Sequence, residues 1–250
     1  MVKNKNFLII LQARQGSTRF PNKVLQKING VPLIIFLLKR LSKCKKADEV
    51  ITAIPKNENN KKLKDTLKKY DFKYFEGSEK NVLERFYLCA KKFNVDNIIR
   101  ITADCPLTDP KMIDSFIEIY QRKNVDYLSN GNLPTFPDGF DIEVFRFSSL
   151  KKSFLKSKSS YEKEHVTPYI KNNKIFSKYN VTNKLDLSDL RLTVDYPEDL
   201  IVIKKIVNQA KKNGNYHFED IIKIINKIKK IMKLNSNYKR NTGSQNSENQ

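Results

Sequence analysis

Short apolar runs rich in β-branched residues alternate along the chain with segments whose apolar residues recur at helical spacing. This alternation is typical of a mostly parallel sheet that is covered by helices. The runs predict strands at residues 7–11, 50–54, 72–75, 97–101, 125–129 and 190–194. The pattern therefore predicts an α/β fold with three layers, α/β/α, around a mostly parallel twisted sheet.

Four segments show the helical period most clearly, at residues 63–70, 113–120, 197–210 and 218–228. The second of them follows Asp109 and Pro110, which predicts an N-cap and a proline in the first turn of that helix. Pro197 is expected to open the third helix.

The length of 250 residues fits one buried α/β domain. We assign residues 1–234 to this domain. Residues 131–184 interrupt the alternation with Pro134, Pro137 and Gly139 and then a Ser- and Lys-rich stretch, so we interpret them as an insertion. Residues 235–250 are polar and are predicted to be a disordered tail.

Composition adds three expectations. The three cysteines form no CxxC pair, so neither a disulfide framework nor a structural zinc site is indicated, and a reducing compartment such as the cytoplasm fits. No uncharged apolar run approaches the roughly 18 residues that a membrane span requires. The net charge of +21 favours polyanions, but lysine is spread along every predicted helix, so we consider nucleic acid an unlikely partner.

The loop that follows the first predicted strand carries the most informative chemistry. It contains Gly16 and Ser17 together with the cations Arg14, Arg19 and Lys23. Ligands of open α/β sheets bind beyond the carboxyl ends of the strands, where such a loop can direct backbone N–H groups and full charges at phosphates. The loop matches neither GxxxxGK[ST] nor GxGxxG, so a P-loop ATPase or a Rossmann dehydrogenase is not supported.

Two carboxylates follow predicted strands elsewhere in the chain. Asp104 comes after the strand at residues 97–101, and Asp195 comes after the strand at residues 190–194. Mg²⁺ typically takes one or two protein carboxylates and completes its octahedron with water and substrate phosphates. Each Asp alone is also a good cap or turn residue, but together with the cationic loop the two predict a Mg²⁺ site.

Six blocks of sequence, in order from Gln12 to Leu200, resemble one known family. They read QARQGSTRFPNKVL, GSEKNVLERF, RITADCPLTDP, FPDGFDIEVF, YEKEHVTPYI and RLTVDYPEDL. As a set they resemble the cytidylyltransferases that include the SpsF-type spore-coat polysaccharide proteins and the synthetases of CMP-KDO and CMP-sialic acid. The resemblance implies a fold of the nucleotide-diphospho-sugar transferase type, CTP as donor, release of pyrophosphate and a homodimer.

The resemblance also implies roles for residues. The catalytic set would be Arg14, Lys23, Asp104 and Asp195, with Asp104 and Asp195 holding Mg²⁺. The nucleotide would lie against Gln12, Ala13, Arg14, Gly16, Ser17, Arg19, Lys23, Arg85 and Asp104. For Arg85, an ion pair on the helix surface is the alternative. Asn22 stands where the family commonly has Gly, and Asn tolerates the left-handed conformation that this turn needs.

The resemblance places the sugar acceptor, and a dimer contact, in the segment at residues 131–184. The residues implied for the acceptor are Asn130, Asp141, Glu143, Glu164 and His165. Loop capping is the alternative for the first three, and packing is the alternative for His165. Ser159 and Glu162 have the spacing of a capping box at the start of the helix that carries Glu164 and His165.

Two other functions are open from the residues. A GT-A-type glycosyltransferase would use a nucleotide sugar on a similar fold, but Asp104 is followed by Cys105 and Pro106 and so lacks the usual Asp-x-Asp motif. A non-catalytic polyanion-binding protein would be explained by the positive charge alone.

Overall fold

The computed structural model describes residues 5–212, 216–238 and 240. Within them, seven strands form one sheet in the order β5-β4-β1-β6-β8-β7-β9. The bounds of these strands are β1 (Lys5–Gln12), β4 (Glu49–Pro55), β5 (Tyr74–Gly77), β6 (Val95–Thr102), β7 (Tyr127–Ser129), β8 (Glu143–Arg146) and β9 (Lys178–Asn180). A small hairpin is formed by β2 (Lys27–Ile28) and β3 (Val31–Pro32).

The central strands of the sheet are parallel. β1 pairs with β4 on one side and with β6 on the other, and β4 pairs with β5. β8 lies antiparallel between β6 and β7, and β9 joins β7 in parallel. The mostly parallel sheet is therefore as predicted, and its carboxyl edge gathers the loops that follow β1 and β6.

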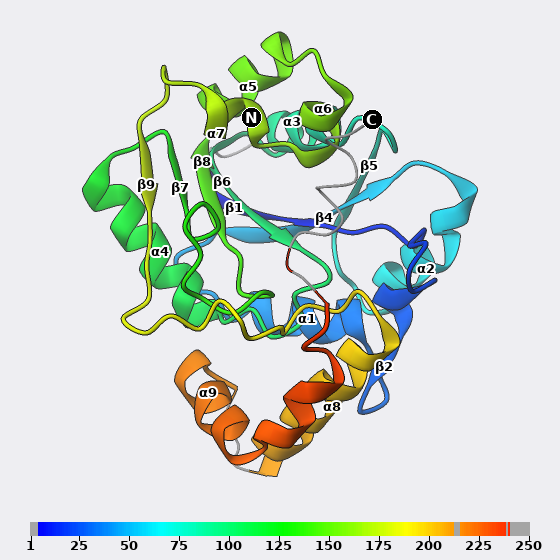
Figure 1. The fold of residues 1–250 in the computed structure, drawn as a ribbon. Helices are drawn as coiled ribbons and strands as arrows, with labels where there is room; N and C mark the ends of the chain where they lie inside the picture. The colour runs from blue at the N-terminus through cyan, green and yellow to red at the C-terminus, as the bar shows by residue number, and fades with distance from the viewer. Residues whose placement is uncertain (1–4, 213–215, 239, 241–250) are drawn as a thin grey trace.

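Helices cover both faces of the sheet. They are α1 (Leu33–Leu41), α2 (Lys61–Lys69), α3 (Val82–Phe93), α4 (Pro110–Lys123), α5 (Phe147–Lys156), α6 (Ser160–His165), α7 (Pro168–Asn172), α8 (Pro197–Lys212) and α9 (Phe218–Lys227). Three 3-10 turns, η1 (Lys23–Leu25), η2 (Glu58–Asn60) and η3 (Lys229–Leu234), complete the described elements. In Figure 1, α3 and α5–α7 lie on one side of the sheet, and α1, α8 and α9 lie on the other.

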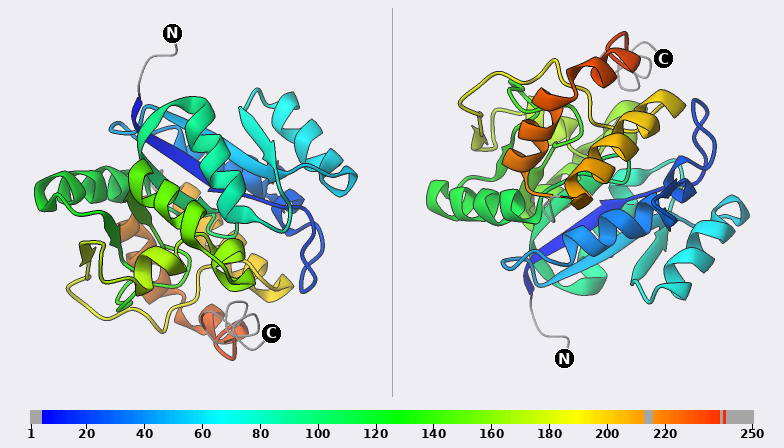
Figure 2. Two further views of the ribbon diagram at one scale, coloured as in Figure 1. Left: turned by 90° about the horizontal axis from the view of Figure 1, so that it is seen from above. Right: turned by 90° about the horizontal axis from the view of Figure 1, so that it is seen from below.

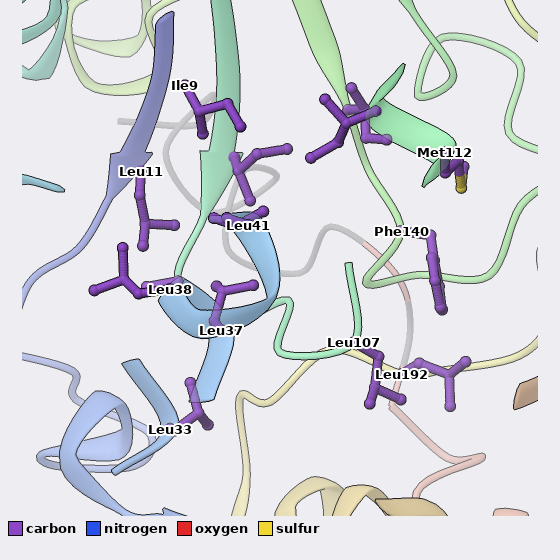
Figure 3. Close-up of a cluster of buried hydrophobic side chains, with 14 of the residues drawn as sticks. Ile9, Leu11, Leu33, Leu37, Leu38, Leu41, Leu107, Met112, Phe140 and Leu192 are labelled. Carbon is purple, nitrogen blue, oxygen red and sulfur yellow. The ribbon is translucent and has the colours of Figure 1, made fainter. Parts of the chain in front are cut away.

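Alternation along β1 explains the three layers. Ile9 and Leu11 point into a core shared with α1, α4, α8 and α9, whereas Leu8 and Ile10 point into a second core beneath α3 and α5. The views from opposite sides in Figure 2 show these two helical layers in turn. Figure 3 shows part of the first core, where Leu37, Leu38 and Leu41 of α1 lie near Leu11. The predicted three-layer fold is confirmed.

The predicted helices are confirmed, including the cap of α4. The Asp109 carboxylate accepts from the backbone N–H of Lys111, and Pro110 stands in the first turn. The capping box of Ser159 and Glu162 at the start of α6 is also present. Five of the predicted strands correspond to β1, β4, β5, β6 and β7 with shifted ends.

The predicted strand at residues 190–194 is wrong. Arg191 makes one isolated bridge with Asp138, and no ladder forms. Leu192 and Val194 are buried, which produces the alternation of a strand, but the backbone N–H groups donate to Asp138 and Asp104 in neighbouring loops. Figure 3 shows Leu192 in the same core as Leu107 and Phe140. Asp195 therefore follows an extended buried segment and precedes α8.

Two further features differ from the simple reading of the sequence. The segment at residues 131–184 contributes β8 and β9 to the sheet itself. Of the predicted disordered tail, residues 239 and 241–250 lie outside the described residues. The prediction of disorder is wrong for Asn235, which is buried. Its side-chain amide donates to the Arg191 carbonyl oxygen and to Asp199 Oδ1.

Candidate active site

The loop after β1 is anchored by hydrogen bonds to the start of α2. The backbone N–H of Gln15 donates to Asn60 Oδ1 (2.8 Å), and Gln15 Oε1 accepts from the backbone N–H of Leu63 (3.1 Å). These bonds tie the loop to the start of α2 and leave Gly16 exposed, with no heavy atom within 4 Å of where a Cβ would stand. The loop is therefore an anchored turn with room beside its backbone.

Asn22 sets the direction of the chain just before Lys23. Its φ of 57° and ψ of 25° are left-handed, as predicted for this position. Its side chain accepts from Gln15 Nε2 (2.8 Å), which closes the loop on itself. Asn pays less steric penalty than other non-glycine residues here, so the turn forms without Gly and starts η1 at Lys23.

The loop after β6 places Asp104 beside the segment that leads to α8. The carbonyl oxygen of Asp104 accepts from the backbone N–H of Val194 (2.8 Å) and from Thr193 Oγ1 (3.2 Å). The two stretches that carry Asp104 and Asp195 are thus joined by direct hydrogen bonds.

Asp195 is positioned by a buried arginine and by the start of α8. The Arg191 guanidinium donates to both oxygens of Asp199 (2.9 and 3.0 Å) and to Asp195 Oδ2 (3.3 Å). Asp199 Oδ2 also accepts from the backbone N–H groups of Asp195 (2.9 Å) and Tyr196 (3.0 Å). Gly139 (φ 102°) packs so tightly on this segment that a Cβ would lie 2.5 Å from the Leu192 carbonyl carbon.

Lys23 joins the three segments. Its Nζ donates to Asp104 Oδ2 (3.1 Å) and to Asp195 Oδ1 (2.8 Å), and its side chain is only 13% exposed. Arg19 adds a second cation to Asp195 Oδ1 (2.9 Å). The predicted cationic turn therefore faces the predicted pair of carboxylates.

The contacts between Lys23 and the carboxylates shift the pKa values of Lys23 and Asp104. Burial opposes the charge of Lys23, but the carboxylates of Asp104 and Asp195 outweigh burial and raise the Lys23 pKa. Burial likewise opposes the charge of Asp104, yet Lys23 and the Thr102 hydroxyl lower the Asp104 pKa to about 2. At neutral pH the site holds an ammonium between two carboxylates.

The two carboxylates fit a hard divalent cation. Both contact the same ammonium nitrogen, so their oxygens already surround one cation. Carboxylate oxygens are the ligands that Mg²⁺ prefers, and two of them suffice when phosphates and water supply the rest. Among the described residues there is no cluster of three or more His, Cys, Asp or Glu side chains that could hold a metal, so a closed all-protein metal cage is not found there.

Arg14 and Arg85 form a second cationic region. Arg14 is exposed and makes no ion pair with the described residues. Arg85 is 1% exposed, donates to the carbonyl oxygen of Ser78 (2.8 Å), and has a buried Nε without a partner among the described residues. Burial, and then the charge of Arg14, lower the Arg85 pKa to about 10. The alternative of a surface ion pair for Arg85 is therefore wrong, because its helix faces inward at this position.

Gln12 lies at the end of a buried polar chain. Arg100 of β6 donates to Gln12 Oε1 through Nε (3.2 Å) and Nη2 (2.9 Å), and its Nη1 pairs with Glu143 of β8. The Glu143 carboxylate also accepts from Tyr127, Thr167 and Lys171. These contacts fill both oxygens of Glu143 and orient the Gln12 amide at the end of β1.

The remaining predicted residues lie in different places. Ala13 is buried beside β4, and Ser17 Oγ accepts from the backbone N–H of Phe20 (3.4 Å). Asn130 is fully buried and braces the loop before β8, donating to the Phe140 carbonyl (2.9 Å) and accepting from the Ile142 N–H (2.9 Å). This geometry favours loop capping for Asn130, although its predicted acceptor role stays a prediction.

Asp141, Glu164 and His165 also stay predictions as acceptor residues. Asp141 pairs with Arg240 and accepts from the Gly139 N–H (3.3 Å). Glu164 and His165 end α6, which packs on α3, and the His165 ring lies 4.7 Å from the Tyr161 ring.

Three residues of the site were not predicted from the sequence. Arg191 and Asp199 position Asp195, and Arg100 positions Gln12. The first two flank Asp195 within RLTVDYPEDL, so their charges were visible. Their spacing pointed to no particular partner because the contacts depend on an irregular loop.

Comparisons with known proteins show the family of this chain. A family model described as Cytidylyltransferase matches residues 8–197. The spore coat polysaccharide biosynthesis protein SpsF of Bacillus subtilis is 30% identical, over 89% of this chain and 95% of that one. A 3-deoxy-manno-octulosonate cytidylyltransferase of Chloroherpeton thalassium is 30% identical over 51% of this chain and 48% of its own.

A solved structure shows the same fold. The structure of a cytidylyltransferase from Leptospira borgpetersenii superposes with a TM-score of 0.85 at 32% identity, and the match covers 91% of this chain and 96% of that one. This match confirms the fold expected for nucleotide-diphospho-sugar transferases. No helix among the described residues has the length and apolar character needed to span a bilayer. The chain belongs to the cytidylyltransferase family and is a CTP-dependent nucleotidyltransferase.

Proposed function

We propose that this enzyme transfers CMP from CTP to a sugar destined for a surface polysaccharide, with Mg²⁺ as cofactor and pyrophosphate as the second product. The observation that supports this most strongly is the shared ion pair of Lys23 with Asp104 and Asp195. A triphosphate needs a positioned cation and a divalent metal ion needs hard anionic oxygens, and this ion pair brings both together.

The basic residues of the site would bind the triphosphate, and Arg85 and Gln12 would contact the rest of the nucleotide. Lys23, Arg14 and Arg19 would neutralise the triphosphate, and the backbone N–H groups of the exposed Gly16 and the half-buried Ser17 would donate to its oxygens. Arg85, whose buried Nε has no partner in the part of the chain that the structure describes, lies beside Arg14 and would contact the nucleotide. Gln12 would do so at the end of β1, held by Arg100 and Glu143.

Asp104 and Asp195 would hold Mg²⁺. When bound there, Mg²⁺ would supply Lewis-acid neutralisation of phosphate charge. The acceptor hydroxyl oxygen attacks the α-phosphorus in line, the bond to the β-phosphate oxygen breaks, pyrophosphate leaves, and the hydroxyl proton passes to solvent. Lys23 and Arg14 would stabilise the charge that builds on the phosphate oxygens and on the departing pyrophosphate.

For the acceptor we propose a KDO-like or nonulosonic sugar acid, or another sugar of surface polysaccharides. The relatives named for 3-deoxy-manno-octulosonate and for spore coat polysaccharide support this class. Asp141, Glu164 and His165 would bind its polar groups, and Asn130 and Glu143 would shape the loop and strand around it. We further propose a homodimer in the cytoplasm, which sedimentation of the purified protein and fractionation of its host would test.

The test is a pyrophosphate-release screen of CTP, UTP, ATP and GTP against candidate sugars, with and without Mg²⁺. We expect release from CTP with one class of sugar acid, only when Mg²⁺ is present. Release of a nucleoside diphosphate from a nucleotide sugar would instead support a glycosyltransferase. Steeply salt-dependent binding of polyanions without any turnover would support a binding protein.

A further inference from the structure

The C-terminal end of the described chain returns to the candidate active site. After η3 (Lys229–Leu234) the chain turns back toward the sheet, as the red segment in Figure 1 shows. Three of its residues, Asn235, Tyr238 and Arg240, contact the loops around Asp195, and we name them the C-terminal clamp. All three lie beyond residue 197, where the family match ends.

Asn235 contacts Arg191 and Asp199, the two residues that position Asp195. It is 1% exposed, and its Nδ2 donates to the Arg191 carbonyl oxygen (3.1 Å) and to Asp199 Oδ1 (2.9 Å). The other oxygen of Asp199 holds the backbone N–H of Asp195 (2.9 Å). The Asn235 amide therefore holds the Asp199 carboxylate in place, and that carboxylate holds the backbone of Asp195.

Tyr238 covers the residue next to Asp195. Its ring stacks on the Tyr196 ring with centroids 3.9 Å apart and planes 9° apart, and its hydroxyl donates to Glu198 Oε2 (3.3 Å). The Arg191 guanidinium lies 5.9 Å from the Tyr196 ring and 5.7 Å from the Tyr238 ring. The stack thus confines both Tyr196 and the arginine that donates to Asp195.

Arg240 connects this side of the site to the loop before β8. It pairs with Asp141 and donates to the Phe136 carbonyl oxygen (3.0 Å). That loop also carries Asp138, which accepts from Arg191 Nη1 (3.1 Å). The clamp therefore contacts the Arg191 network from two directions.

We infer that the C-terminal clamp positions Asp195 for binding the divalent cation, so that Asn235 and Tyr238 are positioning residues of the active site. The inference rests on the proposed role of Asp195 as a metal ligand. Residues that orient metal ligands commonly change metal affinity 10- to 100-fold when they are replaced. Asn235 and Tyr238 act on Asp195 through its backbone and through Arg191, without touching the cation.

The test uses the full chain and Mn²⁺ alone, with binding followed by electron paramagnetic resonance. We expect Asn235→Ala and Tyr238→Ala to weaken Mn²⁺ binding roughly tenfold, at the low end of the range for such positioning groups. Tyr238→Phe keeps the stacked ring and should restore affinity to within about twofold of the parent. Circular dichroism and thermal melting of each variant establish that the fold is retained.

Tyr87→Ala is the matched control. Tyr87 is also a half-buried tyrosine in a stacked pair, with Phe154 (4.4 Å between centroids, 10° between planes), but both belong to the helices on the other face of the sheet. Its loss should lower the melting temperature and leave Mn²⁺ affinity unchanged. A purely structural role for the clamp predicts that Tyr238→Ala behaves in the same way.

The possible results distinguish failure of the clamp inference from failure of the proposed function. If Asn235→Ala and Tyr238→Ala bind Mn²⁺ within twofold of the parent while Asp195→Asn binds it far more weakly, the clamp inference is overturned and the metal site stands. If Asp195→Asn binds Mn²⁺ like the parent, the clamp has no metal ligand to position and the inference also falls. Pyrophosphate release by the unaltered chain then decides the proposed function separately.

Discussion

Lys23 contributes a compact charge at the point where three segments meet. A lysine ammonium is a strongly hydrated point charge on a flexible stem, so placing it 13% exposed between Asp104 and Asp195 requires both carboxylates to compensate for lost hydration. Lys23 therefore also competes with any metal ion that binds the same two carboxylates.

Replacing Lys23 by Met removes the charge and keeps most of the side-chain volume. We expect kcat/KM for CTP to fall roughly 100- to 1,000-fold, as for loss of a preorganised electrostatic donor. Binding of Mn²⁺ alone should become tighter, because two carboxylates lose the cation that they share. Steady-state pyrophosphate release and Mn²⁺ titration measure the two effects. Mn²⁺ binding that is weaker than in the parent would show that Lys23 supports the metal instead of competing with it.

Glu143 gives a prediction for stability. Burial opposes its charge, but Lys171 and Arg100 outweigh burial and hold the Glu143 pKa well below its ordinary 4.5. A lowered folded-state pKa stabilises the protein above the unfolded value, and that contribution is lost as the pH falls below about 4.5. In Glu143→Gln we expect the unfolding free energy at pH 7 to drop by roughly 3–5 kcal/mol, the range for breaking a buried ion pair.

The pH dependence provides the check. Denaturant unfolding of Glu143→Gln should change less between pH 7 and pH 3 than unfolding of the parent. Glu118→Gln is the control, because Glu118 pairs with Lys46 at 57% exposure and should cost less than about 1 kcal/mol. Equal losses in the two variants would contradict a special role for the Glu143 network.

The turn that precedes η1 determines the direction of the Lys23 side chain. Asn22 is left-handed (φ 57°), so Asn22→Gly should keep activity, whereas Asn22→Val places a β-branched side chain in a conformation that costs about 1–2 kcal/mol or more. We expect Asn22→Val to lower kcat roughly tenfold or more, because a misplaced Lys23 loses its orientation, and to lower the melting temperature by only about 2–8 °C, as a strain of this size implies. Turnover equal to the parent in Asn22→Val would show that the turn can change without moving Lys23.

The elements also show what could be predicted from sequence. The helix caps, the central parallel strands and the loops after β1 and β6 follow local rules, and they were predicted correctly. Residues 190–194 were not, because burial of Leu192 and Val194 imitates a strand while their hydrogen bonds go to loops. β8 and β9 were missed because the stretch around them is rich in turn and polar residues.

The same division holds for the candidate site. Lys23, Asp104 and Asp195 were predictable as a group because the first two lie where parallel strands end at the same edge of the sheet. Arg191, Arg100 and Asn235 depend on contacts between loops and strands distant in sequence, and a single sequence carries no signal for such pairing.

The fold brings residues 12–23, the loop after β6 and the start of α8 together at the carboxyl edge of the sheet. The two helical layers bury the central strands on both faces, so those strands form a rigid base for the loops after β1 and β6. We expect these loops together to direct attack on the α-phosphorus of CTP.

The most direct test follows the α-phosphate of CTP. With CTP labelled at the α-phosphorus, Mg²⁺ and 3-deoxy-manno-octulosonate or a related sugar acid, we expect label in the sugar product and unlabelled pyrophosphate. Asp104→Asn should remain folded and lose most of this transfer. Label released as CDP, or an Asp104→Asn rate equal to that of the parent at saturating Mg²⁺, would contradict transfer of CMP at this site.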